Sequence, residues 1–254
     1  MSTRQERMLW LGAGAWLNEA RSRLRWPMLG WLVSGYPVGE MVRGRRVAGG
    51  VALQRGRGPA MQVFVETQRL VLRRFTMADV DNLVGLDADP DVMNFITGGM
   101  PTPRDEIKNE VLPAFLAYYE RFDGYGFWAA IEKPAGEFLG WFHFRPREGA
   151  SPGEAELGYR LRKSAWGKGY ATEGSRALIR KGFTEFGVRR VVAEAMAVNL
   201  ASRRVMEKAG LTLVRSFRQP WPYPIEGDEL GDVEYALYKA GWEQQDRAGP
   251  AGPG

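Results

Sequence analysis

Two glycines and a lysine before a predicted helix form the stretch most suited to chemistry. Gly167 and Gly169 flank Lys168 in SAWGKGYATEG, and a helical pattern begins at Tyr170. Each glycine costs roughly 0.5–1 kcal/mol against alanine in regular structure, so the pair indicates a close backbone approach. A helix start offers unpaired N–H groups and a positive dipole end, which together attract phosphate. We therefore expect a phosphate site here, with a purely steric tight turn as the alternative.

The spacing of this loop disagrees with two familiar nucleotide motifs. A triphosphate P-loop needs a glycine five residues before its lysine and a Ser or Thr after it, but Lys163 and Gly169 occupy those places. A dinucleotide fingerprint meets Thr172 at its third small position. The interpretation that remains is that the successive N–H groups of residues 167–172 face a diphosphate at the helix start.

The amino-acid composition limits the kinds of catalytic group that the protein can use. The 254 residues include no cysteine and a single histidine, His143, which excludes thiolate chemistry and a histidine-rich metal site. Carboxylates, hydroxyls and backbone dipoles remain, and we expect no metal.

The net charge of +5 is unevenly distributed. Residues 1–60 hold ten arginines against three glutamates, a net of +7, so residues 61–254 carry −2. No helical or strand period persists in residues 1–60, which we expect to be a disordered Arg/Gly-rich extension or an artefact of an upstream start codon. The segment has no convincing cleavage site for a signal peptide. Charged residues interrupt every apolar run before ~18 residues, so we expect no membrane span and a cytoplasmic location. A nucleic-acid tether stays an alternative for this segment, although we do not expect nucleic acid as a partner.

Regular elements that could position the loop begin at residue 61. Period-two and helical patterns predict one long strand over residues 63–75 and an α/β order with a mostly antiparallel start and a central strand–helix–strand crossover. A glycine-rich tail, residues 244–254, is expected to be disordered. The other expected elements are helices at 77–87, 103–121, 170–186 and 200–210, and strands at 127–133, 137–146, 155–163, 189–198, 211–218 and 232–239.

The helix after the loop has a face suited to close packing on a sheet. Gly174, Leu178 and Gly182 recur at spacings of three and four, with Phe183 beside them. Such packing would hold the helix start firmly in place.

Three blocks in order resemble the GNAT superfamily of N-acetyltransferases, and within it the RimJ/RimL-like branch. The blocks are VETQRLVLRRF, ELGYRL followed by WGKGYATEG, and NLASRRVMEKAGL, and the resemblance covers most of residues 63–240. It implies an acetyltransferase domain over residues 61–243 with an α/β (α+β) fold. The expected core is a mixed, mostly antiparallel sheet of six to seven strands flanked by about four helices.

The resemblance implies acetyl-CoA as the acyl donor, with its diphosphate on the loop and its pantetheine arm along the strand that ends near residue 162. The loop pattern of the family is Q/R-x-x-G-x-G/A, and Trp166 departs from it at the first position. The residues that the resemblance assigns to the cofactor are Leu161, Arg162, Trp166, Gly167, Lys168, Gly169, Tyr170, Ala171, Thr172 and Asn199.

Acetyl transfer to an amine requires a neutral amine, a stabilised oxyanion and a proton for the departing thiolate. Glu156, on the predicted central strand, is the first candidate base, acting directly or through water, and His143 on the adjacent strand is the second; either could instead be structural. We expect a backbone N–H near Tyr159 or Leu161 to hold the oxyanion.

The proton donor is less obvious. Many relatives carry a tyrosine seven residues after the asparagine, but Met206 stands there, and the resemblance points instead to Ser202, three residues after Asn199. Asn199 and Ser202 also fit an ordinary helix N-terminus.

The resemblance implies a primary amine as acceptor, either a protein N-terminus such as that of a ribosomal protein or a small molecule such as an aminocyclitol. Acidic and aromatic residues in RQPWPYPIEGDELGD suit a cationic amine through charge and cation–π contact, and equally suit an exposed hairpin loop. A non-catalytic acyl-CoA sensor and a homodimer remain open alternatives.

Overall fold

The computed structural model describes residues 62–147, 153–221 and 225–248. The expectations for residues 1–60 and for the last six residues lie outside these ranges. Among the described ranges, no helix combines the length and apolar character that crossing a bilayer requires.

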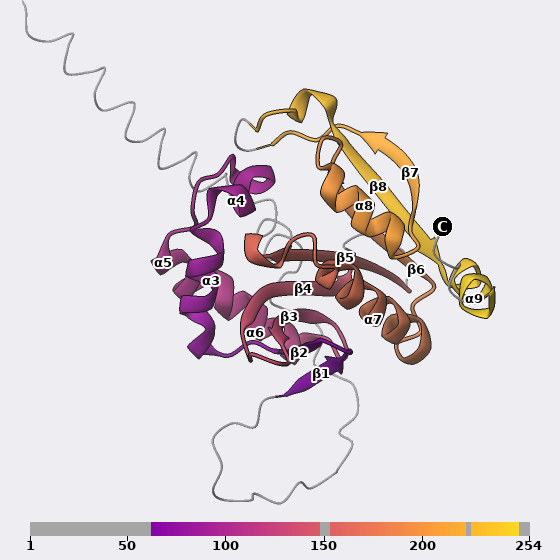
Figure 1. Ribbon diagram of the computed structural model, residues 1–254, viewed down its shortest axis with the longest axis horizontal. Coiled ribbons are helices and arrows are strands. Elements are labelled where there is room, and N and C mark those ends of the chain that lie inside the picture. The colour runs from indigo at the N-terminus through magenta and orange to yellow at the C-terminus, as the bar shows by residue number, and fades with distance from the viewer. Residues whose placement is uncertain (1–61, 148–152, 222–224, 249–254) are drawn as a thin grey trace, which may run out of the picture. The chain divides into compact units, whose positions relative to one another are not determined.

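The centre of the fold is one sheet of eight strands in the order β1-β2-β3-β4-β5-β6-β8-β7 (Figure 1). All neighbours are antiparallel except β5 and β6, which are parallel because α7 connects them. The strands are β1 Val63–Glu66, β2 Leu70–Arg74, β3 Gly126–Glu132, β4 Phe138–Pro146, β5 Glu154–Leu161, β6 Arg190–Met196, β7 Thr212–Phe217 and β8 Asp232–Tyr238.

The strand count exceeds the expected six to seven because the predicted strand over residues 63–75 folds into a hairpin. Thr67 makes the turn: its N–H donates to the Leu70 carbonyl at 2.9 Å, and its hydroxyl accepts from the Leu70 N–H at 2.9 Å. The side-chain oxygen of threonine thus replaces a backbone partner, a turn chemistry that an alternation pattern does not register.

Helices lie between and beyond these strands. They are α3 Val80–Asp87, α4 Pro90–Thr97, α5 Arg104–Glu106, α6 Leu112–Arg121, α7 Tyr170–Glu185, α8 Leu200–Lys208 and α9 Lys239–Ala248, with short turns η1 Met77–Asp79, η3 Lys163–Ala165 and η4 Asp228–Leu230.

Two helices differ from expectation. The patterns missed α4, although Asp89 caps it through the Asp91 N–H at 3.0 Å and Pro90 takes the first position, a recognisable start. The predicted helix over residues 103–121 contains a π turn, η2 Ile107–Val111, directly before Pro113. This wider turn accommodates the proline, which has no N–H to donate.

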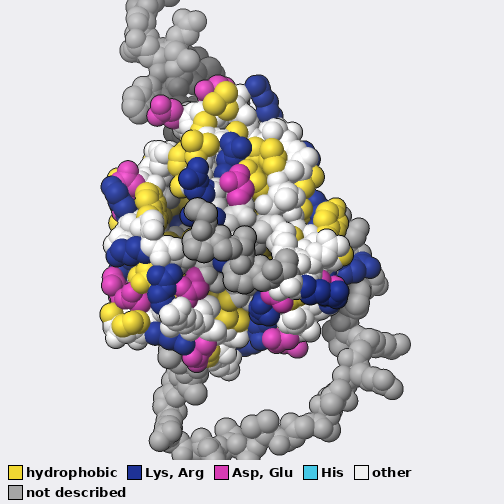
Figure 2. Space-filling view, turned by 45° about the vertical axis from the view of Figure 1, so that its right-hand side comes forward, with side chains coloured by type: hydrophobic (Ala, Val, Ile, Leu, Met, Phe, Trp, Pro, Cys, Tyr) yellow, Lys and Arg dark blue, Asp and Glu magenta, His cyan; other side chains and the backbone are white. Residues whose placement is uncertain are grey.

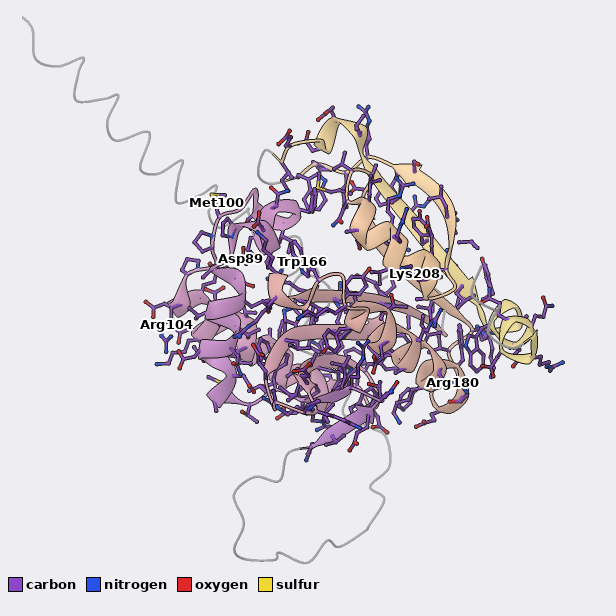
Figure 3. The ribbon with its side chains drawn as sticks, viewed as in Figure 1. Asp89, Met100, Arg104, Trp166, Arg180 and Lys208 are labelled. Atoms are coloured by element: carbon purple, nitrogen blue, oxygen red, sulfur yellow. The ribbon has the colours of Figure 1, made fainter. Side chains whose placement is uncertain are left out.

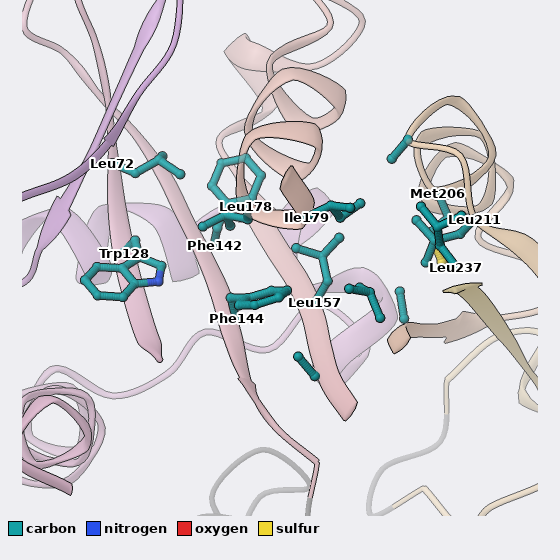
Figure 4. Close-up of a cluster of buried hydrophobic side chains, with 14 of the residues drawn as sticks. Leu72, Trp128, Phe142, Phe144, Leu157, Leu178, Ile179, Met206, Leu211 and Leu237 are labelled. Atoms are coloured by element: carbon teal, nitrogen blue, oxygen red, sulfur yellow. The ribbon is translucent and has the colours of Figure 1, made fainter. Parts of the chain in front are cut away.

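One face of the sheet carries the main apolar core, under α7 and α8. Figure 4 shows Phe142 and Phe144 of β4 beside Leu178 and Ile179 of α7, and all four side chains are buried. α7 approaches closely because glycines face the rings: a Cβ at Gly174 would lie 2.4 Å from the Phe142 ring. The predicted small-residue face therefore does pack on the sheet.

The opposite face contacts α3 and α6. Phe115 of α6 stacks on Phe127 of β3 with ring centroids 3.9 Å apart. Arg160 of β5 forms a buried ion pair with Asp87 of α3 at 2.6 Å, and Asp87 also accepts from the Thr102 hydroxyl. A buried charge requires such full pairing, so these contacts fix where α3 lies on the sheet.

The C-terminal helix continues past residue 243, the expected end of the domain. α9 runs to Ala248, so its last five residues are ordered helix instead of the disordered tail that was expected. The reason is tertiary: Trp242 packs on Phe183 of α7 with centroids 5.4 Å apart, and Arg180 pairs with Asp246 at 2.6 Å.

The close approach of α7 gives a stability prediction. We expect Gly174→Ala to lower the free energy of unfolding by about 1–3 kcal/mol, because overpacking against Phe142 outweighs the better helix propensity of alanine. Gly241→Ala in α9 is the matched control, since no atom lies within 4 Å of its added Cβ. Urea unfolding measures both, and equal effects of the two changes would contradict the tight contact.

Candidate active site

The parallel strands β5 and β6 separate soon after they pair. Their register covers only three residue pairs, from Glu154 with Arg190 to Glu156 with Val192. Beyond these pairs β5 continues to Leu161 and β6 to Met196 without pairing to each other. The result is an opening within the sheet, bordered by the last halves of two strands.

The free edge of β5 offers backbone donors to this opening. The Arg162 N–H bonds to the Leu139 carbonyl on the β4 side at 2.8 Å, and the β4–β5 register is regular over its whole length. Because N–H directions alternate along a strand, the N–H groups of Tyr159 and Leu161 point away from β4, toward the opening. Arg162, expected to contact the cofactor, has its N–H engaged by β4 instead.

The predicted phosphate loop closes one end of the opening. Gly167 and Gly169 adopt positive φ values of 72° and 83°, and Gly169 caps α7 without any side-chain hydrogen bond. The first bond within the helix is from the Glu173 N–H to the Gly169 carbonyl. In the described part of the chain the N–H groups of residues 167–172 have no partner, so they are available to an anion.

A network that the sequence did not reveal fixes this loop. Glu173 of α7 accepts from the Thr67 hydroxyl at 2.6 Å and pairs with the Arg69 guanidinium at 2.7 Å. Arg69 also donates to the Lys168 carbonyl at 2.9 Å and lies over the Tyr170 ring. Burial would raise the pKa of Glu173, but the bonds from Thr67 and Arg69 lower it. The β1–β2 turn thus holds the start of α7.

Other predicted cofactor residues take different places. Trp166 donates its indole N–H to the Leu161 carbonyl at 2.9 Å and so links the end of β5 to the loop. The Tyr170 side chain is buried and bonds to Glu132, which leaves only its backbone for a ligand. In Figure 3, Trp166 lies near Asp89, the residue before α4, and Lys163 pairs with Asp91 in the same region. Lys168 is exposed, and Ala171 and Thr172 are half-buried in the first turn of α7.

Asn199 and Ser202 stand on the far side of the opening, where β6 leads into α8. Asn199 caps the helix by accepting from the Ser202 N–H at 3.0 Å, which leaves its amide NH2 for another partner. The Tyr159 hydroxyl lies 3.0 Å from both the carbonyl oxygen and Oγ of Ser202. Met206, in the position where many relatives have a tyrosine, is buried in the core.

The two candidate bases lie together on the other face of the sheet. His143 Nε2 is 3.3 Å from Glu156 Oε1, and Arg145 Nη2 is 3.2 Å from Glu156 Oε2. The His143 ring lies over Gly158, where a Cβ would come within 2.4 Å of it. Neither ring nitrogen makes a well-aligned hydrogen bond among the described residues. Because side chains alternate on β5, Glu156 and Tyr159 lie on opposite sides of the sheet.

Electrostatics distinguish the two bases. Burial opposes ionisation of Glu156, but the contacts with His143 and Arg145 hold its pKa at about 2. Burial lowers the pKa of His143, only partly offset by Glu156. Arg145 therefore supplies the positive charge, with Glu156 ionised and His143 neutral at pH 7.

A further carboxyl, missed from the sequence, lies on the same face. Glu194 of β6 pairs with Arg147 and stands opposite Glu234 of β8. Burial raises its pKa to about 7, and Glu156 and Glu234 add to the effect while Arg147 opposes it. Alternation in RRVVAEAMAV placed Glu194 on a strand, but the neighbouring charges come from the residue after β4 and from β5, β7 and β8.

One face of the molecule shows no single sign of charge. Figure 2 shows basic and acidic side chains interspersed over one face of the molecule. In the loop between β7 and β8, Glu226 and Glu229 are exposed and Asp228 is half-buried, while Tyr223 lies outside the described residues.

Comparisons with known proteins agree with this geometry. The family described as "Acetyltransferase (GNAT) domain" matches residues 69–212, more than half of the chain. The chain therefore belongs to the GNAT acetyltransferase family, and it is an acetyl-CoA-dependent acyltransferase.

Three similar proteins illustrate the range of this family. An Aspergillus fumigatus protein named FsC-acetyl coenzyme A-N(2)-transacetylase is 34% identical over 176 residues, 67% of this chain and 71% of that one. The structure of RimL, a ribosomal L7/L12 alpha-N-protein acetyltransferase in complex with coenzyme A, matches with a TM-score of 0.58, 22% identity and coverage of 70% and 98%. Aminoglycoside acetyltransferase AAC(6')-Ib in complex with coenzyme A matches with a TM-score of 0.55, 22% identity and coverage of 70% and 99%. At these identities the two structures support the fold alone.

The low pKa of Glu156 gives a prediction about acid stability. A depressed folded-state pKa stabilises the protein above the unfolded value of 4.5 and loses that effect as the pH falls toward 2. We expect Glu156→Gln to be less stable than the parent at pH 7 by about 3 kcal/mol, and the difference to shrink steadily below pH 4.5. Urea unfolding of both proteins from pH 7 to 3 measures it, and a constant difference would contradict the assigned ionisation.

Proposed function

We propose that this protein transfers the acetyl group of acetyl-CoA directly to a primary amine in a ternary complex. The observation that supports it most is the juxtaposition of two sets of free backbone donors. Unpartnered N–H groups at the start of α7 stand next to the unpaired edge of β5.

The fit to acetyl-CoA follows from the chemistry of these donors. The amides of residues 167–172 would hold the diphosphate, and the Tyr159 and Leu161 edge would pair with the amides of the pantetheine arm, much as an added strand does. The Asn199 amide NH2, which the capping bond leaves free, would donate to the same arm from the β6 side. The Tyr159 N–H is the proposed oxyanion donor.

The amine would approach from the face that carries Glu156. Ionised at every pH near neutrality, Glu156 attracts the ammonium form and accepts its proton through an intervening water, with neutral His143 beside it.

The acceptor is proposed as a class. The relatives described above act, by their names, on an FsC compound, a ribosomal protein N-terminus and an aminoglycoside, and all are amine acylations. We therefore keep both a protein N-terminus and a small-molecule amine as candidates, and the RimJ/RimL-like branch as a proposal. A non-catalytic sensor is not favoured, since these named relatives are acetyltransferases.

An acceptor screen tests the proposal. The full-length protein with acetyl-CoA is offered a panel of N-terminal peptides, polyamines and aminocyclitols. Two quantities are recorded: the mass gain of one acetyl group on the acceptor and the release of thiol. Acetylation of at least one amine is expected. Saturable acetyl-CoA binding with no product on any amine would favour the sensor.

Two variants of similar shape that differ in charge test the diphosphate site. The Cβ position of Gly167 is open, with no atom within 4 Å, and Asn and Asp both tolerate positive φ better than other residues. We expect Gly167→Asp to weaken acetyl-CoA binding at least about tenfold more than Gly167→Asn, because only Asp repels phosphate at close range. Calorimetry at low and high salt measures this, and equal affinities would place the diphosphate elsewhere.

A carboxyl pair tests the proton acceptor. We expect Glu156→Gln to lower kcat/KM by about 10²-fold, the usual range for a lost proton acceptor. Glu194→Gln, on the same face, should stay within about threefold of the parent. Circular dichroism confirms folding at the assay temperature. The reverse ranking of the two variants would move the role to Glu194.

A further inference from the structure

The contact between Tyr159 and Ser202 joins the two sides of the opening. Tyr159 belongs to the half of β5 that no longer pairs with β6, and Ser202 lies in the first turn of the helix that follows β6. The phenol oxygen is 3.0 Å from Ser202 Oγ, and either hydroxyl can be the donor. Its single proton can instead be donated to the Ser202 carbonyl, which is also 3.0 Å away. The two residues are 43 positions apart in sequence, so only the tertiary structure pairs them.

Tyr159 contributes both a backbone group and a side chain to the border of the opening. Its backbone N–H points toward the gap, and its side chain turns to the α7 and α8 face, where the ring packs 6.0 Å from Phe142. The hydroxyl is thereby held beside Ser202 by a rigid strand and a packed ring. A phenol fixed at this place is close to where the proposed reaction needs a proton.

The two hydroxyls differ in acidity. A phenol ionises much more readily than the aliphatic hydroxyl of serine, so Ser202 alone is a poor acid for a departing thiolate. Burial raises the pKa of Tyr159 to about 12, and the bond from Ser202 lowers it. Among the described residues no charged group shifts it, so Tyr159 keeps its proton at neutral pH and can donate it.

We propose that Tyr159 supplies the proton for the departing thiolate of coenzyme A, acting through Ser202 Oγ. This inference rests on the proposed acetyl transfer. As the tetrahedral intermediate collapses, the C–S bond breaks and its electron pair goes to sulfur. Ser202 Oγ gives its proton to sulfur and takes one from the Tyr159 hydroxyl. The tyrosinate regains a proton from solvent, and Glu156 releases the proton of the amine to solvent, so atoms and charge balance over the cycle.

The side chain at position 206 agrees with this assignment. Met206 is buried against the core and carries no ionisable proton, so α8 itself offers no acid there. β5 supplies the phenol from the opposite side of the opening instead. Tyr159 is thus a positioning and relay residue, and Ser202 is the group that meets the sulfur.

Tyr159→Phe tests the relay, because it keeps the ring and removes only the hydroxyl. We expect kcat to fall about 10–100-fold while the Kd for acetyl-CoA changes less than about twofold. Ser202→Ala should behave alike, and Ser202→Thr, which keeps a hydroxyl, should retain most of the parental kcat. The double variant Tyr159→Phe with Ser202→Ala should be no slower than the slower single variant, since both remove one pathway.

Tyr235→Phe is the matched control. Tyr235 is also a buried strand tyrosine bonded to α8, through Glu207 at 3.0 Å and Arg203 at 3.2 Å, but it lies on β8. The Tyr235→Phe variant reports any loosening of α8, and the kcat of this variant should stay within about threefold of the parental value.

Three results would overturn the inference: full activity of Tyr159→Phe, an equal loss in Tyr235→Phe, or multiplicative losses in the double variant. Each is measured against a parent protein that acetylates an amine. A parent that acetylates none overturns the proposed function itself, so the two failures are distinguishable.

Discussion

The early separation of β5 from β6 is the constraint on which the rest of this structure depends. Three residue pairs join the strands, and beyond them each strand keeps backbone groups that no neighbour satisfies. An unpaired strand edge within a sheet is costly unless something fills it, and water or a ligand with amide groups can do so. In the proposed function, the acyl donor fills the place that this separation creates.

The opening can hold a ligand in one defined position only if its borders are rigid. α7 is held at its start by the Arg69–Glu173 pair and along its length by Gly174 against Phe142. These contacts join the β1–β2 turn, the loop and the sheet, so the free N–H groups stay aimed in one direction. Such preorganisation is what makes backbone amides effective as an anion site.

The sheet also separates two kinds of chemistry. Strand alternation sends Glu156 and His143 to one face and Tyr159 to the other, where α8 brings Ser202. An ionised carboxylate and a protonated phenol thus lie on either side of one strand. In the proposed reaction, proton removal and proton supply are opposite tasks, and groups in such different environments suit them.

Local patterns determined much of this protein: the strands from β3 onward, the helix after the glycine loop, the loop itself and the Asn199 cap all follow from spacing, alternation and capping chemistry. The resemblance added the family. Other features depend on residues that are distant in the chain, and the sequence did not determine them. They are the Thr67 turn that splits the first strand, the Trp242 contact that orders α9, the charges around Glu194 and the phenol of Tyr159 beside Ser202. Periodicity records which way a side chain points, but which groups meet it is decided by packing between elements.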